Sequence, residues 1–89
     1  MAQFLLESFV PKEDGGAVEG RTGNARRAAE EMSREGTLVR YQRSIFLPED
    51  ETCFYLFEAA SAEDVAETAR RAGLPFERVA EAITAAEDG

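Results

Sequence analysis

The sequence predicts an α+β domain whose elements follow the order β-α-β-β-α-β. Three observations predict this order. Two segments carry apolar residues at helical spacing, short apolar segments rich in aromatic residues flank them, and two of those short segments are joined by a few turn-forming residues. With 89 residues, the chain is expected to form one domain spanning 1–89.

The first strand is predicted at the N-terminus. Residues 4–10 form a short apolar run with two phenylalanines, and Pro11 ends it, which is typical of a strand. Residues 12–16 are charged and contain two glycines, so they predict a loop.

The first helix is predicted from an apolar stripe with steps of three and four residues. The stripe consists of Val18, Thr22, Ala25, Ala29 and Met32. Asp14 is the expected N-terminal cap, and Gly36 is the expected stop. Gly20 and Gly23 are poor helix formers, so the first turns are expected to fray and the firm helix to begin at Gly23 or Asn24.

The middle of the chain predicts an antiparallel hairpin. Residues 37–47 and 52–58 read as strands, and the turn-forming run Pro48-Glu49-Asp50 separates them. Strict alternation in the first of these strands gives two faces. One face carries Val39, Tyr41, Arg43, Ile45 and Leu47, and the other carries Leu38, Arg40, Gln42, Ser44 and Phe46.

The second helix has the clearest boundaries. Ser61 and Asp64 have the spacing of a capping box, and Gly73 followed by Leu74 and Pro75 is a common helix stop. Residues 79–84 alternate and predict the last strand, and 85–89 predict a loose tail.

This order is the split βαβ arrangement of ferredoxin-like domains, a four-stranded antiparallel sheet with two helices on one face. Such a sheet has one wet face, so its strands are expected to alternate apolar with polar residues. Both faces of the hairpin instead carry large apolar groups. The sequence therefore predicts a homodimer, in which sheet-to-sheet association gives a dimeric α/β-barrel-like assembly with an enclosed cleft.

The composition of the chain limits the classes of binding partner that are expected. The formal net charge is −8, with 18 acidic and 10 basic residues, which disfavours nucleic acids and anionic membranes as partners. Neither a signal peptide nor an apolar run long enough to span a bilayer is recognisable, so the chain is expected to be soluble and cytoplasmic. A single cysteine permits no disulfide within the chain.

The chain contains no histidine, which removes the commonest general base and the commonest transition-metal ligand. No catalytic residues are predicted. Glu7 and Glu58 are acids within apolar strands. The strands that carry them are central neighbours in a ferredoxin-like sheet, so the two carboxylates are candidates to approach each other. Such acids are ion-paired, with Arg40 or Arg43 as partners, or they bind a cation. Cys53 is a buried apolar residue, a third metal ligand or a reactive thiol.

A candidate ligand-binding cleft consists of Tyr41, Arg43 and Tyr55. If the hairpin register places Arg43 opposite Tyr55, the three share one face and give an amphipathic lining with polar tips. Packing between two copies of the chain explains the same residues equally well.

Three segments together resemble a family of small bacterial domains of unknown function that includes a nickel-binding protein. They are 39–46 (VRYQRSIF), 51–59 (ETCFYLFEA) and 69–79 (ARRAGLPFERV), and Phe4-Leu5-Leu6-Glu7 fits as well. The resemblance implies a ferredoxin-like fold, a homodimer and, for at least one member, nickel binding. Relatives often carry a histidine that this chain lacks, so a cation site here must use carboxylate, tyrosine, thiolate or backbone oxygen.

Three functions follow from these features. The first is a homodimeric protein that binds a small ligand or a metal ion, with nickel as the candidate. The second is a cofactor-independent enzyme of the dimeric α/β-barrel type, which the missing histidine argues against. The third is a ligand-free structural or regulatory dimer.

Overall fold

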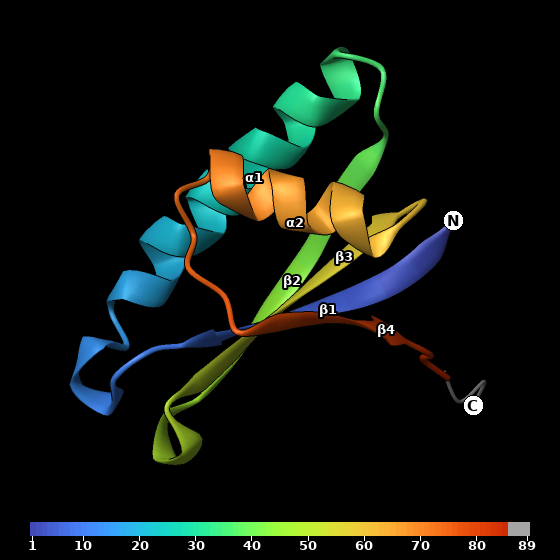
Figure 1. Cartoon of the computed structure of the whole chain (residues 1–89). Coiled ribbons are helices and arrows are strands. Elements are labelled where there is room, and N and C mark those ends of the chain that lie inside the picture. The colour runs from blue at the N-terminus through green and yellow to red at the C-terminus, as the bar shows by residue number, and fades with distance from the viewer. Residues whose placement is uncertain (86–89) are drawn as a thin grey trace.

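The computed structural model describes residues 1–85 and confirms the predicted order of elements. Two helices cover one face of a four-stranded antiparallel sheet with strand order β2-β3-β1-β4 (Figure 1). The elements are β1 (Ala2–Phe9), α1 (Ala17–Arg34), β2 (Val39–Leu47), β3 (Thr52–Ala59), α2 (Ala62–Arg71) and β4 (Arg78–Ala82), with short 3-10 helices η1 (Lys12–Asp14) and η2 (Pro48–Asp50). As predicted, β1 and β3 are the central strands.

Helix α1 is longer and more regular than the sequence predicts. It begins at Ala17 and runs through Gly20 and Gly23, so the expected fraying is wrong. Contacts with the sheet explain the difference, because the Thr22 hydroxyl is 2.6 Å from the hydroxyl of Ser44 on β2. The cap prediction is also wrong: Asp14 lies in η1, and no side chain caps the helix.

Both helices end just before the predicted glycine stops. At the end of α1, Gly36 has φ +104°, and its amide donates to the Ser33 carbonyl at 3.1 Å while the Thr37 amide donates to the Met32 carbonyl at 3.0 Å. This is the Schellman arrangement, which a residue with a side chain adopts only with strain. Gly73, with φ +66°, has the same role after α2.

The predicted N-terminal cap of α2 is confirmed. Ser61 has extended backbone angles, and its hydroxyl accepts the Asp64 amide at 3.2 Å. Ser61→Ala is therefore expected to lower the free energy of unfolding by about 1 kcal/mol, measured by urea denaturation. Ser61→Asp keeps an acceptor at this position and is expected to leave stability unchanged, so an equal loss in both variants would contradict this role for the cap.

A β-bulge in β2 changes which residues share a face. Tyr41 pairs with Phe57, but the next pair is Arg43 with Leu56, so Gln42 is the extra residue. The strict alternation predicted for this strand is therefore wrong after Tyr41. Ser44 and Phe46 join Val39 and Tyr41 on the helix side of the sheet. Arg43, Ile45 and Leu47 lie on the opposite side with Arg40.

Strand β4 is shorter than predicted, because it ends at Ala82 where β1 has only its first residues left to pair. Ile83 is outside the strand and 94% exposed. Most of the predicted loose tail, residues 86–89, lies outside the described residues.

The core lies between the sheet and the two helices. Its largest fully buried side chains include Tyr55, Phe57, Leu6 and Val65. Arg71 on α2 joins the helices, because its guanidinium is 2.9 Å from Glu31 on α1 and 2.8 Å from Glu35, the residue that follows α1. The hydrogen bond from Arg71 holds the pKa of the Glu35 carboxyl below its usual value. No helix in residues 1–85 has the length and apolar character needed to cross a membrane.

Candidate functional site

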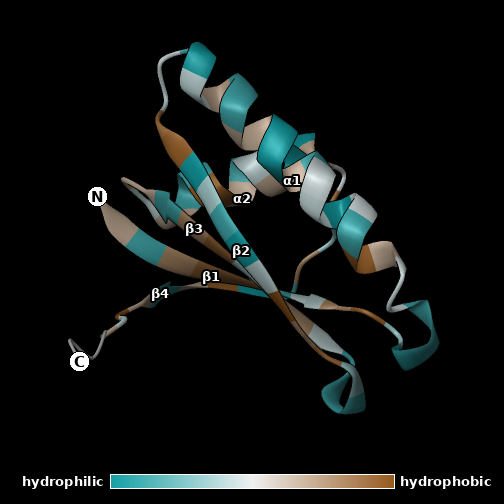
Figure 2. Cartoon of the chain, turned by 180° about the vertical axis from the view of Figure 1, so that it is seen from behind, coloured by the Kyte–Doolittle hydropathy of each residue, from teal (hydrophilic) through white to brown (hydrophobic). Residues whose placement is uncertain are grey.

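The side of the sheet without helices forms an open surface, which we call the outer face. Strand register assigns to it Gln3, Leu5, Glu7 and Phe9 of β1, Arg40, Arg43, Ile45 and Leu47 of β2, Thr52, Phe54, Leu56 and Glu58 of β3, and Arg78, Ala80 and Ala82 of β4. No other element of residues 1–85 covers this face, as the two views of the ribbon show (Figures 1 and 2).

The centre of the outer face is apolar and its margins are charged. Leu5, Leu56 and Ala80 lie side by side in one row across the sheet, and Phe54 lies between Ile45 and Glu7 in the next. Phe9 is 53% exposed and Ile45 is 45% exposed. Leu56 is only 9% exposed, so the exposed apolar surface lies mainly on the side chains around it, with Leu47 at 40%. An exposed apolar patch on a small domain is typical of an interaction surface.

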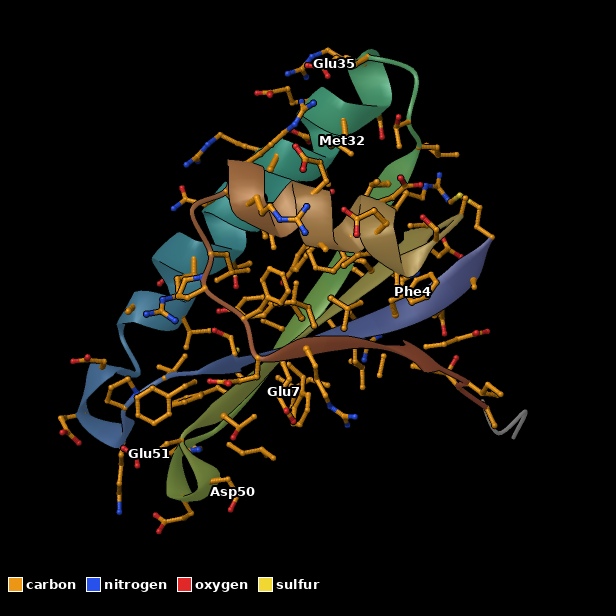
Figure 3. All side chains as sticks on the ribbon, in the orientation of Figure 1. Phe4, Glu7, Met32, Glu35, Asp50 and Glu51 are labelled. Atoms are coloured by element: carbon orange, nitrogen blue, oxygen red, sulfur yellow. The ribbon has the colours of Figure 1, made fainter. Side chains whose placement is uncertain are left out.

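Both candidate carboxylates lie on the outer face. The Glu7 side chain projects to the side away from the helices, whereas Phe4 projects toward them (Figure 3). Glu7 Oε2 is 3.6 Å from Arg78 Nε, and Glu58 Oε1 is 3.7 Å from Arg40 Nη1. The two carboxylates are about 30% exposed (30% and 27%), so both remain accessible to solvent.

The three predicted metal ligands do not form one site within a chain. Glu58 pairs with Gln3 in the register, four residues before Glu7, and four residues of strand span about 13 Å. The expectation that Glu7 and Glu58 approach each other within one chain is therefore wrong. Cys53 is fully buried on the helix side of the sheet. Throughout residues 1–85, no group of three or more Cys, Asp or Glu side chains is placed to hold a metal ion.

The predicted cleft of Tyr41, Arg43 and Tyr55 is divided between the two sides of the sheet. Tyr41 and Tyr55 face the helices, and Arg43 lies on the outer face. The expectation that Arg43 lies opposite Tyr55 is wrong: Ser44 pairs with Tyr55, and Arg43 pairs with Leu56. The bulge at Gln42 causes this shift.

Tyr55 and Cys53 are neighbouring buried polar side chains on the helix side of the sheet. The Tyr55 hydroxyl is fully buried and has no hydrogen-bond partner among the described residues. Burial raises the pKa of the Tyr55 hydroxyl well above its usual value, with the neighbouring Cys53 as a further cause. Burial also raises the pKa of the Cys53 thiol, so the neutral thiol, a poor metal ligand, is favoured there.

A second site, which the sequence reasoning missed, is a groove between α1 and β2. It has a volume of about 810 Å³. Its lining includes Arg26, Glu30 and Arg34 from α1. Val39 and Tyr41 from the start of β2, and Leu38 just before this strand, also line it. The spacing of the three charged α1 residues, four apart in the sequence, was the available signal, because such residues line one side of a helix.

Comparisons with known proteins identify the family. Residues 4–82 match the family model described as nickel responsive protein SCO4226-like. The chain belongs to this family. The match confirms the resemblance found in the sequence.

Among solved structures, the chain is similar to SCO4226 from Streptomyces coelicolor A3(2), known from a crystal structure analysis. The TM-score is 0.71 at 21% sequence identity, and the match covers 96% of this chain and 100% of the other. At this level of identity, the likeness supports the fold alone. A search of curated proteins found no match.

Proposed function

We propose that this protein is a homodimer that pairs through the outer face and binds a divalent metal ion, with nickel as the first candidate, at carboxylates within that interface. The observation that carries the proposal is an open apolar sheet face in which two partly exposed carboxylates are set. The description of the family as nickel responsive gives the choice of metal.

The apolar centre of the outer face supports pairing with a second copy. Leu5, Phe54 and Leu56 make a central apolar area, and Ile45 and Phe9 extend it toward its edges. Two-fold pairing buries the same surface on both chains, so one self-complementary patch is enough. A domain of this size has a small core, and additional apolar burial in a dimer raises its stability.

The dimer also supplies ligands that one chain lacks. Glu7 and Glu58 stand about 13 Å apart along the strands of a single chain. Face-to-face pairing about a two-fold axis that lies in the interface plane, parallel to the outer face, doubles each carboxylate. A metal ion in the interface is then bound by residues of both chains. Carboxylate oxygens suit hard cations such as Mg²⁺ and Mn²⁺, whereas nickel prefers imidazole, so a histidine-free carboxylate site is expected to bind nickel more weakly than an imidazole site does.

The existing ion pairs of these carboxylates are loose. Charge-assisted hydrogen bonds have lengths of about 2.7–2.9 Å. The separations at Arg78–Glu7 and Arg40–Glu58 are 3.6 and 3.7 Å, and both arginine side chains are 69% exposed. Such exposed pairs contribute little stability, so a bound cation displaces them at small cost.

Calorimetric titration of nickel into the purified protein tests this function. Saturable binding is expected in the wild type, and Glu7→Gln or Glu58→Gln is expected to weaken it by at least about ten-fold, because a neutral amide removes a charged ligand. Glu81→Gln is the matched control, since Glu81 is an exposed acid on β4 that pairs with Phe4 and lies outside the outer face. Binding that is unchanged in both test variants, or no binding at all, would reject these ligands.

A further inference from the structure

The arginines of this acidic protein are concentrated on α1 and β2. Six of its 10 basic residues lie on these two elements, although the net charge of the chain is −8. They are Arg21, Arg26, Arg27 and Arg34 on α1 and Arg40 and Arg43 on β2. The groove between α1 and β2 therefore has a different charge balance from the rest of the surface, with three lining arginines against two lining glutamates.

Two of the groove arginines have no carboxylate partner in the described part of the chain. Neither Arg26 nor Arg34 forms an ion pair there, although Glu30 lies midway between them on the same side of α1. By contrast, Arg70 on α2 is 3.0 Å from Glu63 and 3.1 Å from Glu67. Arg26 and Arg34 thus retain guanidinium hydrogen-bond donors for a ligand.

The floor of the groove is apolar. Ala29 and Val39 are buried beneath it, and Leu38 is 53% exposed at its margin. The Arg26 guanidinium lies over the Tyr41 ring, 5.5 Å from its centroid, a cation–π contact that favours this position of the guanidinium at the groove. A volume of about 810 Å³ is within the range of small-molecule sites.

The walls of the groove are held together at both ends. Near the start of β2, the Ser33 hydroxyl donates to the Val39 carbonyl at 3.0 Å and accepts the Val39 amide at 3.1 Å. Beyond the other end, Ser44 lies 2.6 Å from Thr22 and 2.6 Å from the Tyr41 hydroxyl. Binding in a groove whose walls are already fixed loses little conformational entropy.

From these observations we infer that the groove between α1 and β2 binds a small organic anion, a carboxylate or a phosphate ester with a compact apolar body. The acid group is bound by the guanidinium of Arg26 or Arg34, whose planar donors match both oxyanions. The apolar body lies on Leu38 and Val39 and against Tyr41. Arg26, Arg34 and the apolar floor are on the helix side of β2, and Arg40 and Glu58 of the outer face complete the lining at the edge of the sheet. The groove therefore shares Glu58 with the proposed metal site, but its acid-binding arginines require neither the metal ion nor the dimer.

The test is an amide-resolved NMR titration of the 15N-labelled protein in metal-free buffer containing a chelator. Phenyl phosphate and benzoate are the anionic probes, and phenol and benzylamine are the neutral and cationic controls. Saturable shifts are expected for residues 29–34 and 38–42 with at least one anion, and no saturable shifts there with either control. The probe that binds more tightly shows whether the groove prefers a phosphate or a carboxylate.

Arginine variants test which side chains bind the acid group of the ligand. Arg26→Gln combined with Arg34→Gln is expected to weaken binding by at least about ten-fold, since charge-assisted hydrogen bonds are lost. Arg27→Gln is the matched control, because Arg27 lies on the same helix, is bonded to Asn24 and does not line this groove. The same spectra report whether each variant is folded. The inference would be overturned if benzylamine bound as tightly as the anionic probes, or if the shifts did not saturate. It would also be overturned if the folded double variant bound the anion with wild-type affinity.

Discussion

Phe54→Glu is expected to convert the proposed dimer into a folded monomer. Phe54 lies on the outer face between Ile45 and Glu7, so the new carboxylate would lie in the apolar centre of the proposed interface and beside an existing acid. Two-fold pairing places this charge in the interface twice. A buried charge without a partner costs several kcal/mol, so the dissociation constant is expected to rise by at least about 100-fold.

Light scattering measures the outcome directly. At micromolar concentration, the wild type is expected at twice the chain mass of 9.8 kDa and Phe54→Glu at the chain mass itself. Ile83→Glu is the control, because Ile83 is 94% exposed and lies beyond the end of β4. A Phe54→Glu variant that keeps the mass of a dimer would show that the outer face is not the interface.

The second large effect is a loss of stability at alkaline pH. Burial raises the pKa of both Tyr55 and Cys53 in the folded protein. In the unfolded chain these groups titrate at ordinary values of about 10 and 8.5, so the unfolded state loses its protons first. The free energy of unfolding is therefore unaffected below those pH values. It falls as the pH rises above them, by about 1.4 kcal/mol per pH unit for each group.

Urea denaturation between about pH 8 and 11 measures this slope. Tyr55→Phe is expected to remove the part of the alkaline stability loss that begins near pH 10. It is also expected to raise the free energy of unfolding at neutral pH by about 1 kcal/mol, because a buried hydroxyl without a hydrogen-bond partner is removed. Cys53→Ala is expected to remove the part that begins near pH 8.5. A slope that is the same in wild type and both variants would show that other groups control the alkaline transition.

Features specified by local sequence were predicted correctly. The order of the elements, the Ser61 cap and the glycine stops at Gly36 and Gly73 depend on a few neighbouring residues each, so the sequence alone reveals them. The first turns of α1 were predicted wrongly, because contacts such as Thr22 with Ser44 outweigh the low helix propensity of Gly20 and Gly23.

The errors at the candidate site have a different origin. The bulge at Gln42 adds one residue to β2, and a shift of one residue moves every later side chain to the other face. Neither the alternation of the strand nor its turn reveals that residue, so Arg43 was assigned to the wrong side. The separation of Glu7 from Glu58 depends on the register between β1 and β3, which are paired across a long stretch of chain.

The groove between α1 and β2 was missed for a related reason. Its arginines were visible at helical spacing, but their position opposite Leu38 and Tyr41 depends on how α1 packs over β2. Sequence periodicity gives the side of a helix on which residues lie, and it does not give the strand that this side meets.

The most direct test of the proposed function is a crystal structure of the protein with nickel, with anomalous scattering measured at the nickel absorption edge. The proposal predicts two chains packed outer face to outer face, with an anomalous peak between them at bonding distance from a carboxylate oxygen of Glu7 or Glu58. A peak beside other residues, or chains that leave the outer face exposed to solvent, would contradict it.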